Sequence, residues 1–216
     1  EIAVAWRGRA HRAELGLIGS FQAENALVAA GLAIATGGEP QAVLAALPGL
    51  RGVRGRMQRA ATRANGAAVY VDYAHTPAAL STAIEALRPH VPGRLVVVFG
   101  AGGDRDPGKR PLMGRAVAEL ADAAIVTDDN PRSEDPAAIR AAVREGAPHA
   151  EEIGDRAQAI LAGVEALRNP GDCLLIAGKG HEPGQEMAGE VHPFDDVEQA
   201  RAAVTALDAV EQEFGA

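Results

Sequence analysis

The chain has 216 residues, of which 47% are hydrophobic and 23% charged, a composition typical of a globular protein rather than a disordered or fibrous one. Its formal net charge of −8 disfavours nonspecific attraction to nucleic acids and anionic membranes, so we expect no nucleic-acid partner. No apolar run reaches the roughly 20 residues that cross a bilayer, and no signal-peptide pattern is present, so we expect no membrane insertion and a cytoplasmic location.

The N-terminal segment predicts a hairpin followed by a helix. Residues 2–6 and 13–18 flank a charged run and have the character of two strands. The Ala- and Leu-rich segment from Ser20 to Ala35 predicts a helix with Ser20 as its cap. The side chains expected to be mostly buried on this helix are Leu27, Ala30, Leu32 and Ile34. The chain begins without Met in a segment with strand character, which indicates a piece of a longer protein.

A second short helix is expected over residues 40–47, after a Gly-Gly break. The segment 48–55 is dense in Gly and Arg and therefore indicates a linker. We accordingly predict two domains, one over residues 1–52 and one over residues 53–216.

Beyond the linker, apolar segments with strand character alternate with amphipathic segments. The expected strands are 57–62, 68–72, 95–99, 124–127, 151–153 and 173–177. The expected helices are 77–87, 110–121, 136–145, 156–167 and 197–211. This alternation predicts an α/β fold with a mostly parallel sheet covered by helices on both faces. The turn at Asn65-Gly66 predicts an antiparallel hairpin at the edge of that sheet, and the single cysteine, Cys173, lies in an apolar run that predicts a buried, unreactive thiol.

Four polar or Gly-rich loops directly follow four of the expected strands. They span residues 72–77, 100–110, 127–132 and 177–182. Because the carboxyl ends of parallel strands meet at one edge of a sheet, where ligands commonly bind, we expect these loops to lie together. Jointly they favour a ligand site over four independent solvated turns.

Taken alone, each loop has an ordinary alternative. Residues 129–132 combine an acceptor, an amide, a stiffening proline and a forked cation, which suits a ligand with both ammonium and carboxylate groups. A solvated Asn-Pro turn explains the same residues equally well. Residues 100–110 resemble a phosphate-binding turn, but no Ser or Thr follows Gly108-Lys109 as a Walker loop requires, so a surface turn is favoured.

The other two loops are also open to two interpretations. Residues 178–182 form either a solvated turn or a close approach for a ligand whose ammonium donates to Glu182. His75 either bonds within its own loop, the commoner case, or touches a nucleotide. The His and Cys residues lack zinc-site spacing, and the loop aspartates are more simply explained by solvation than by magnesium, so we predict no metal site in the chain.

Five segments together resemble the Mur ligase family, and within it the ligases that add meso-diaminopimelate to a peptidoglycan precursor. They are Gly55–Met57, Val71–Pro77, Gly102–Pro111, Asp129–Arg132 and Gly178–Glu182. Their order and spacing match over essentially the whole chain. The resemblance implies that residues 1–52 are the tail of a central P-loop ATPase domain and that residues 53–216 form a Rossmann-like domain that binds the amino acid.

The resemblance also implies roles for particular residues. The implied meso-diaminopimelate site consists of Arg105, Asp129, Asn130, Arg132, Gly178 and Glu182. The implied nucleotide-binding residues are Asn25, Arg56, Asp72 and His75. Gln22 and Gln58 depart from the family pattern, which usually has Asn and often Glu there, so the nucleotide contacts near them are less certain.

The implied reaction uses ATP and Mg²⁺ to join meso-diaminopimelate to the D-glutamate of a UDP-N-acetylmuramoyl dipeptide. The family's phosphate loop, magnesium ligands and modified lysine would precede the first residue. We therefore expect no catalytic residue in this chain and no activity of the chain alone. We also expect the enzyme to be a monomer. The alternatives are a ligase that adds glutamates to folate and a non-catalytic module that binds an amino acid or nucleotide.

Overall fold

The computed structural model of the chain describes residues 1–214. The chain divides into two compact units, Glu1–Val53 and Arg54–Ala216. In the first, β1 (Ile2–Trp6) and β2 (Arg9–Ala13) form an antiparallel pair. Helices α1 (Ser20–Ala35) and α2 (Pro40–Ala46) and the 3-10 turn η1 (Leu47–Gly49) complete this unit. Its small core consists of Ala13, Ala26, Ala30, Leu44 and Leu47.

Two predictions for this unit were wrong in detail. The second strand is Arg9–Ala13 rather than 13–18, because Arg7 and Gly8 both adopt positive φ and close a tight turn that pairs Trp6 with Arg9. The helix α1 is confirmed with the predicted bounds, but its N-cap is Gly19 and Ser20 makes no capping bond.

The burial predicted for α1 was correct only in part. Ala30 is buried as expected and Ile34 is half-buried. Leu27 and Leu32 are 38% and 62% exposed, so the buried stripe of α1 is made by the small side chains Ala26 and Ala30.

The second unit is built on a six-stranded sheet of order β3-β4-β8-β5-β6-β7. All neighbouring pairs are parallel except β3 with β4, which form the predicted antiparallel hairpin at the sheet edge. The strands are β3 (Gln58–Thr62), β4 (Ala68–Asp72), β5 (Leu95–Phe99), β6 (Ala123–Val126), β7 (Glu151–Glu152) and β8 (Cys173–Ala177). The predicted Rossmann-like α/β fold is therefore confirmed.

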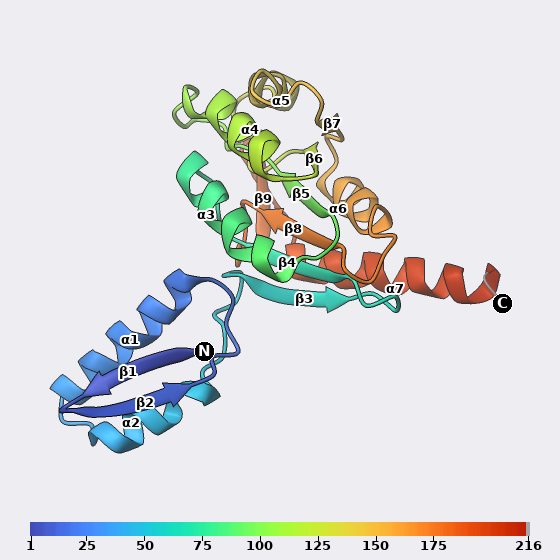
Figure 1. Cartoon of the computed structure of the whole chain (residues 1–216). Coiled ribbons are helices and arrows are strands. Elements are labelled where there is room, and N and C mark those ends of the chain that lie inside the picture. The colour runs from blue at the N-terminus through green and yellow to red at the C-terminus, as the bar shows by residue number, and fades with distance from the viewer. Residues whose placement is uncertain (215–216) are drawn as a thin grey trace. The chain divides into compact units, whose positions relative to one another are not determined.

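Helices cover both faces of this sheet (Figure 1). They are α3 (Pro77–Leu87) with the 3-10 turn η2 (Arg88–His90), α4 (Lys109–Leu120), α5 (Pro136–Arg144), α6 (Arg156–Glu165) and α7 (Asp196–Phe214). On one face, Val96 and Val98 pack with side chains of α6 and α7. Leu95, Val97 and Phe99 alternate with them, are fully buried, and face the layer of α3, α4 and α5.

Most predicted elements are confirmed, several with the same bounds and the others shifted by up to three residues at their ends. The hairpin of β9 (Gly184–Met187) and β10 (Glu190–Pro193) was not predicted. This hairpin has no apolar run, and all of β10 is exposed, so it lacks the alternation that predicts a strand.

Cys173 is buried, and burial raises the pKa of its thiol to about 12, so the prediction of an unreactive thiol is confirmed. Across residues 1–214, the structure contains no helix that is both long and apolar enough to span a membrane.

Candidate functional site

A pocket of about 220 Å³ lies at the edge of the sheet where β4, β5, β6 and β8 end. Each of the four loops predicted to meet there contributes to its lining. The lining residues are Tyr73, His75, Gly102, Arg105, Lys109, Asp129, Asn130, Arg132, Gly178 and Glu182. The structure thus brings together all six residues expected for the amino-acid site, and His75 with them.

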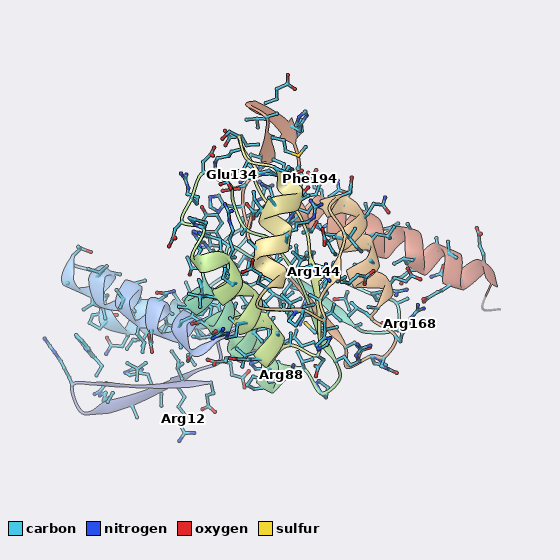
Figure 2. All side chains as sticks on the ribbon, turned by 90° about the horizontal axis from the view of Figure 1, so that it is seen from above. Arg12, Arg88, Glu134, Arg144, Arg168 and Phe194 are labelled. Carbon is cyan, nitrogen blue, oxygen red and sulfur yellow. The ribbon has the colours of Figure 1, made fainter. Side chains whose placement is uncertain are left out.

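The loops after β5 and β6 are joined through backbone contacts and ion pairs. Arg132 donates from Nη1 to the Gly103 carbonyl at 2.8 Å. A Cβ placed on Gly103 would lie 1.8 Å from the Pro131 carbonyl oxygen, so only glycine allows this approach. Glu134, labelled in Figure 2, accepts hydrogen bonds from Arg110 at 2.7 Å and from the Asp104 backbone at 2.6 Å. The two loops therefore form one wall of the pocket.

Asn130 is bonded at both ends of its side chain. Its Oδ1 accepts from Lys179 Nζ at 2.8 Å and from the Glu186 backbone at 2.9 Å, and its Nδ2 donates to Glu182 Oε2 at 2.9 Å. Lys179 is fully buried and also pairs with Glu182 Oε2 at 3.3 Å. Burial alone would raise the pKa of Glu182, but the Asn130 bond and the Lys179 charge lower it overall, so Glu182 is held as a carboxylate.

Asp129 is buried against the backbone of Gly178. Its Oδ2 has no hydrogen-bond partner within residues 1–214. Burial raises the pKa of Asp129, with the charges of Arg156 and Lys179 opposing that shift. Gly178 has φ +122°, and a Cβ on it would lie 2.4 Å from Asp129 Oδ2, which leaves no space for a side chain. Asp129 is therefore a buried acceptor at the pocket, and no donor to its Oδ2 is found in the described part of the chain.

Replacing Asp129 by asparagine is expected to raise the midpoint of thermal unfolding at pH 7. The ordinary carboxyl pKa is 3.8, and burial places the folded-state value above it. Between the two values the folded state binds more protons, so the free energy of unfolding falls as pH rises through that window. Asp129→Asn removes this loss. Thermal unfolding at pH 4 and pH 7, with the exposed Asp106→Asn as control, measures it; a lower midpoint at pH 7 would show that Arg156 and Lys179 outweigh burial.

The buried guanidinium of Arg156 bonds to the backbone of two loops that line the pocket. Arg156 pairs with Asp196 through two contacts, at 2.7 and 2.8 Å, and the side chains of both residues are fully buried. It also donates to the carbonyls of Ala177, at 3.1 Å, and Asp128, at 3.4 Å. These carbonyls belong to the residues just before Gly178 and Asp129. One side chain thus holds two of the four loops.

Two of the residues expected to bind nucleotide, Arg56 and His75, contact the ring of Tyr73. Arg56 lies over the Tyr73 ring, with Cζ 4.4 Å from the centroid. The Tyr73 ring also contacts His75 and His181, at centroid distances of 4.6 and 5.1 Å. His75 Nδ1 lies 2.8 Å from the Tyr73 carbonyl, the within-loop bond considered above. This aromatic group is suited to stacking with a planar ligand.

Neither Asp72 nor Arg56 is among the residues that line the pocket, and Asn25 belongs to the first unit. Asp72 accepts from the backbones of Met57 at 2.7 Å and Ala74 at 2.8 Å, so it holds the loop that carries Tyr73. Burial raises the pKa of Asp72, and these two bonds oppose the shift. Asn25 is exposed on α1 of the first unit.

Several residues that build the site had no function predicted from the sequence. Lys179 lies in the loop 178–182, for which a role was expected of Glu182 but not of the lysine. Arg156 marked the start of a predicted helix, where a charged residue is normally solvated. Gln185, which donates to the Asp129 carbonyl at 2.8 Å, and Glu186 lie on the hairpin of β9 and β10, which was not predicted.

A family model described as "Mur ligase, glutamate ligase domain" matches residues 55–180. The chain belongs to the Mur ligase family. A UDP-N-acetylmuramoyl-L-alanyl-D-glutamate--2,6-diaminopimelate ligase of Caulobacter vibrioides is 59% identical over 209 residues, which are 97% of this chain and 43% of that relative. The ligase of the same name from Bradyrhizobium diazoefficiens is 57% identical over 94% of this chain and 42% of its own length.

Solved structures share the fold of this chain. A structure of a UDP-N-acetylmuramoyl-L-alanyl-D-glutamate--2,6-diaminopimelate ligase superposes with a TM-score of 0.69 and 42% identity, over 95% of this chain and 42% of that chain. A Mycobacterium tuberculosis folylpolyglutamate synthase complexed with ADP and AMPPCP has a TM-score of 0.61 and 23% identity, over 90% and 41% of the two chains, which shows the fold alone. The chain spans about two fifths of the length of the curated relatives it matches. The predicted resemblance to the Mur ligase family is thus confirmed.

Proposed function

We propose that the complete protein uses ATP to join meso-diaminopimelate to the D-glutamate of UDP-N-acetylmuramoyl-L-alanyl-D-glutamate, as a cytoplasmic enzyme of peptidoglycan synthesis that acts as a monomer. This chain would supply the amino-acid site and part of the nucleotide site. The names of the Mur ligase relatives support the reaction. The observation that carries the amino-acid site is the pocket itself, where acidic and basic side chains line one small volume.

The lining has the groups that one end of a diamino dicarboxylic acid requires. Asp129 and Glu182, which both line the pocket, would accept hydrogen bonds from an ammonium, and Glu182 is held as a carboxylate. Arg132 and Arg105 would pair with the carboxylate on the same carbon. Lysine lacks that carboxylate and would make no ion pair with Arg132 or Arg105, so the site would disfavour it.

Holding the distal end in this way leaves the other amine free to react. In the proposed reaction ATP phosphorylates the D-glutamate side-chain carboxylate, and the free amine then attacks the acyl phosphate and displaces phosphate. This chain would contribute positioning, which makes the encounter of amine and acyl phosphate effectively unimolecular.

ATP binding by this chain would involve the aromatic group around Tyr73. Its three rings and the Arg56 guanidinium suit the base and ribose side of a nucleotide. Within residues 1–214 no cluster of three or more His, Cys, Asp or Glu side chains suits a metal ion. We propose that Mg²⁺ and the phosphates are held by the ATPase domain, of which residues 1–52 would be the tail.

Arg132→Ala tests the proposed amino-acid site in a full-length ligase that carries this chain as its carboxy-terminal part. We expect the KM for meso-diaminopimelate to rise about 10- to 150-fold, because a hydrogen bond between charged groups contributes about 1.5–3 kcal/mol. The KM for ATP should stay unchanged. Arg168→Ala is the matched control, since the Arg168 side chain is 65% exposed and pairs only with Glu165 within the described residues. Unaltered diaminopimelate use by Arg132→Ala would refute the assignment.

A further inference from the structure

The hairpin of β9 and β10 is attached to the loop that carries the proposed selectivity residues. Arg132 donates its backbone N–H to the Glu186 carbonyl at 3.0 Å, and the Ala188 N–H donates to the Arg132 carbonyl at 2.8 Å. Glu186 N–H donates to Asn130 Oδ1, and Gln185 Nε2 donates to the Asp129 carbonyl. These four bonds hold the backbone of Glu186 next to Asn130 and Arg132, two residues that line the pocket.

The donors of Arg132 are already partly used. An arginine binds a carboxylate through two parallel donors, either Nε with Nη2 or Nη1 with Nη2. Nη1 donates to the Gly103 carbonyl at 2.8 Å, and Nε lies 3.2 Å from Glu186 Oε2 in an ion pair. Among the described residues none accepts a hydrogen bond from Nη2. Nη1 is therefore already bonded to backbone carbonyls, of Gly103 at 2.8 Å and of Asn130 at 3.5 Å, and the Glu186 carboxylate lies beside Nε, so an incoming carboxylate competes with a group already present at either fork.

We propose that Glu186 is a specificity-determining residue that occupies the Nε end of Arg132 and is displaced by the carboxylate of the incoming amino acid. This inference rests on the proposed function. The Glu186 side chain is 43% exposed, so it returns to water at little cost when it leaves. Its backbone contacts do not depend on the carboxylate.

The ion pair between Glu186 and Arg132 lowers the affinity of the pocket for ligands that carry a carboxylate. A ligand carboxylate must replace Glu186 at Nε while Glu186 also repels it. A ligand whose ammonium is also bound by Asp129 and Glu182 offsets this cost, whereas a ligand with a carboxylate alone offsets less of it. Glu186 thus lowers the affinity for every carboxylate ligand, and its effect is relatively greatest on ligands without the distal ammonium, such as 2-aminopimelate.

Glu186→Gln in the full-length ligase that carries this chain tests the inference. We expect the dissociation constant and KM for meso-diaminopimelate to fall about two- to five-fold, the range for an exposed ion pair, with the KM for ATP unchanged. Inhibition by 2-aminopimelate should strengthen by at least the same factor. Raising the salt concentration should reduce the difference in meso-diaminopimelate affinity between the unmodified protein and the variant. A merely structural contact, when lost, would weaken binding rather than strengthen it.

Glu190→Gln is the matched control, because Glu190 lies on the same hairpin, its side chain is 79% exposed, and it faces His192 at 3.8 Å. It should leave both constants unchanged. The effect of Glu186→Gln should also disappear in an Arg132→Ala background. If Arg132→Ala impairs diaminopimelate use but Glu186→Gln leaves affinity unchanged or lowers it, this inference fails and the proposed function stands. If Arg132→Ala has no effect, both fail.

Discussion

Arg156→Met is expected to lower the free energy of unfolding by about 3–5 kcal/mol, because Asp196 would keep a buried charge without its partner. The two side chains are fully buried and meet through two contacts. Urea unfolding of the chain measures the change. Arg168→Met is the control, because its exposed ion pair with Glu165 contributes about 1 kcal/mol at most.

The double variant Arg156→Met/Asp196→Leu separates the stability of the pair from its effect on the pocket. Replacing both charges by apolar side chains of similar volume is often nearly neutral for stability. The carbonyls of Ala177 and Asp128 would still lose their shared donor. We therefore expect stability to recover in the double variant while diaminopimelate affinity stays below that of the unmodified protein. Full recovery of affinity would show that Arg156 serves stability alone.

Lys179→Met is expected to reduce diaminopimelate affinity at least about 10-fold and stability by about 1–3 kcal/mol. Its Nζ is buried and donates to Asn130 Oδ1 and Glu182 Oε2, so the substitution leaves two acceptors without that donor. The positions of Asn130 and Glu182 in the pocket would then be less well defined. Calorimetric titration and urea unfolding, both in the full-length ligase, give the two values.

The same variant has a pH signature. The Lys179 charge helps to lower the pKa of Glu182, so its removal raises that pKa. Protonated Glu182 carries no negative charge to attract an ammonium. As the pH is lowered, the affinity for diaminopimelate should therefore begin to fall at a higher pH in Lys179→Met than in the unmodified protein. An unchanged pH profile of affinity would contradict the role assigned to Lys179.

Local signals were sufficient for much of the fold. The helix α3 has its predicted bounds because Thr76 caps it through a bond from Ala79 N–H, Pro77 occupies the first turn, and apolar residues recur with helical period. The strands β5 and β8 are continuous apolar runs buried on both faces, which is the pattern of a central parallel strand. The position of the pocket followed from the same reasoning, since loops after parallel strands share one edge.

Other features carried no local signal. The charged run around His11 forms strand β2 because the Arg7-Gly8 turn places it opposite β1, and its composition alone does not predict a strand. The hairpin of β9 and β10 is polar and exposed, so burial does not impose an alternating pattern on it. Its function in the site comes from the backbone bonds it makes to Arg132.

Periodic burial in the sequence defines the strands, and the strands define the loops, so the residue types at the carboxyl edge of the sheet were predictable without a structure. Which charges pair at that edge became known from the folded arrangement. Arg156 meets Asp196 across 40 residues of chain, Lys179 meets Asn130 across 49, and Arg132 meets Glu186 on a separate hairpin. Such pairs form because the fold brings together segments that are distant in the sequence, and because burial makes an unpaired charge costly. Neither effect is encoded in the spacing of neighbouring residues.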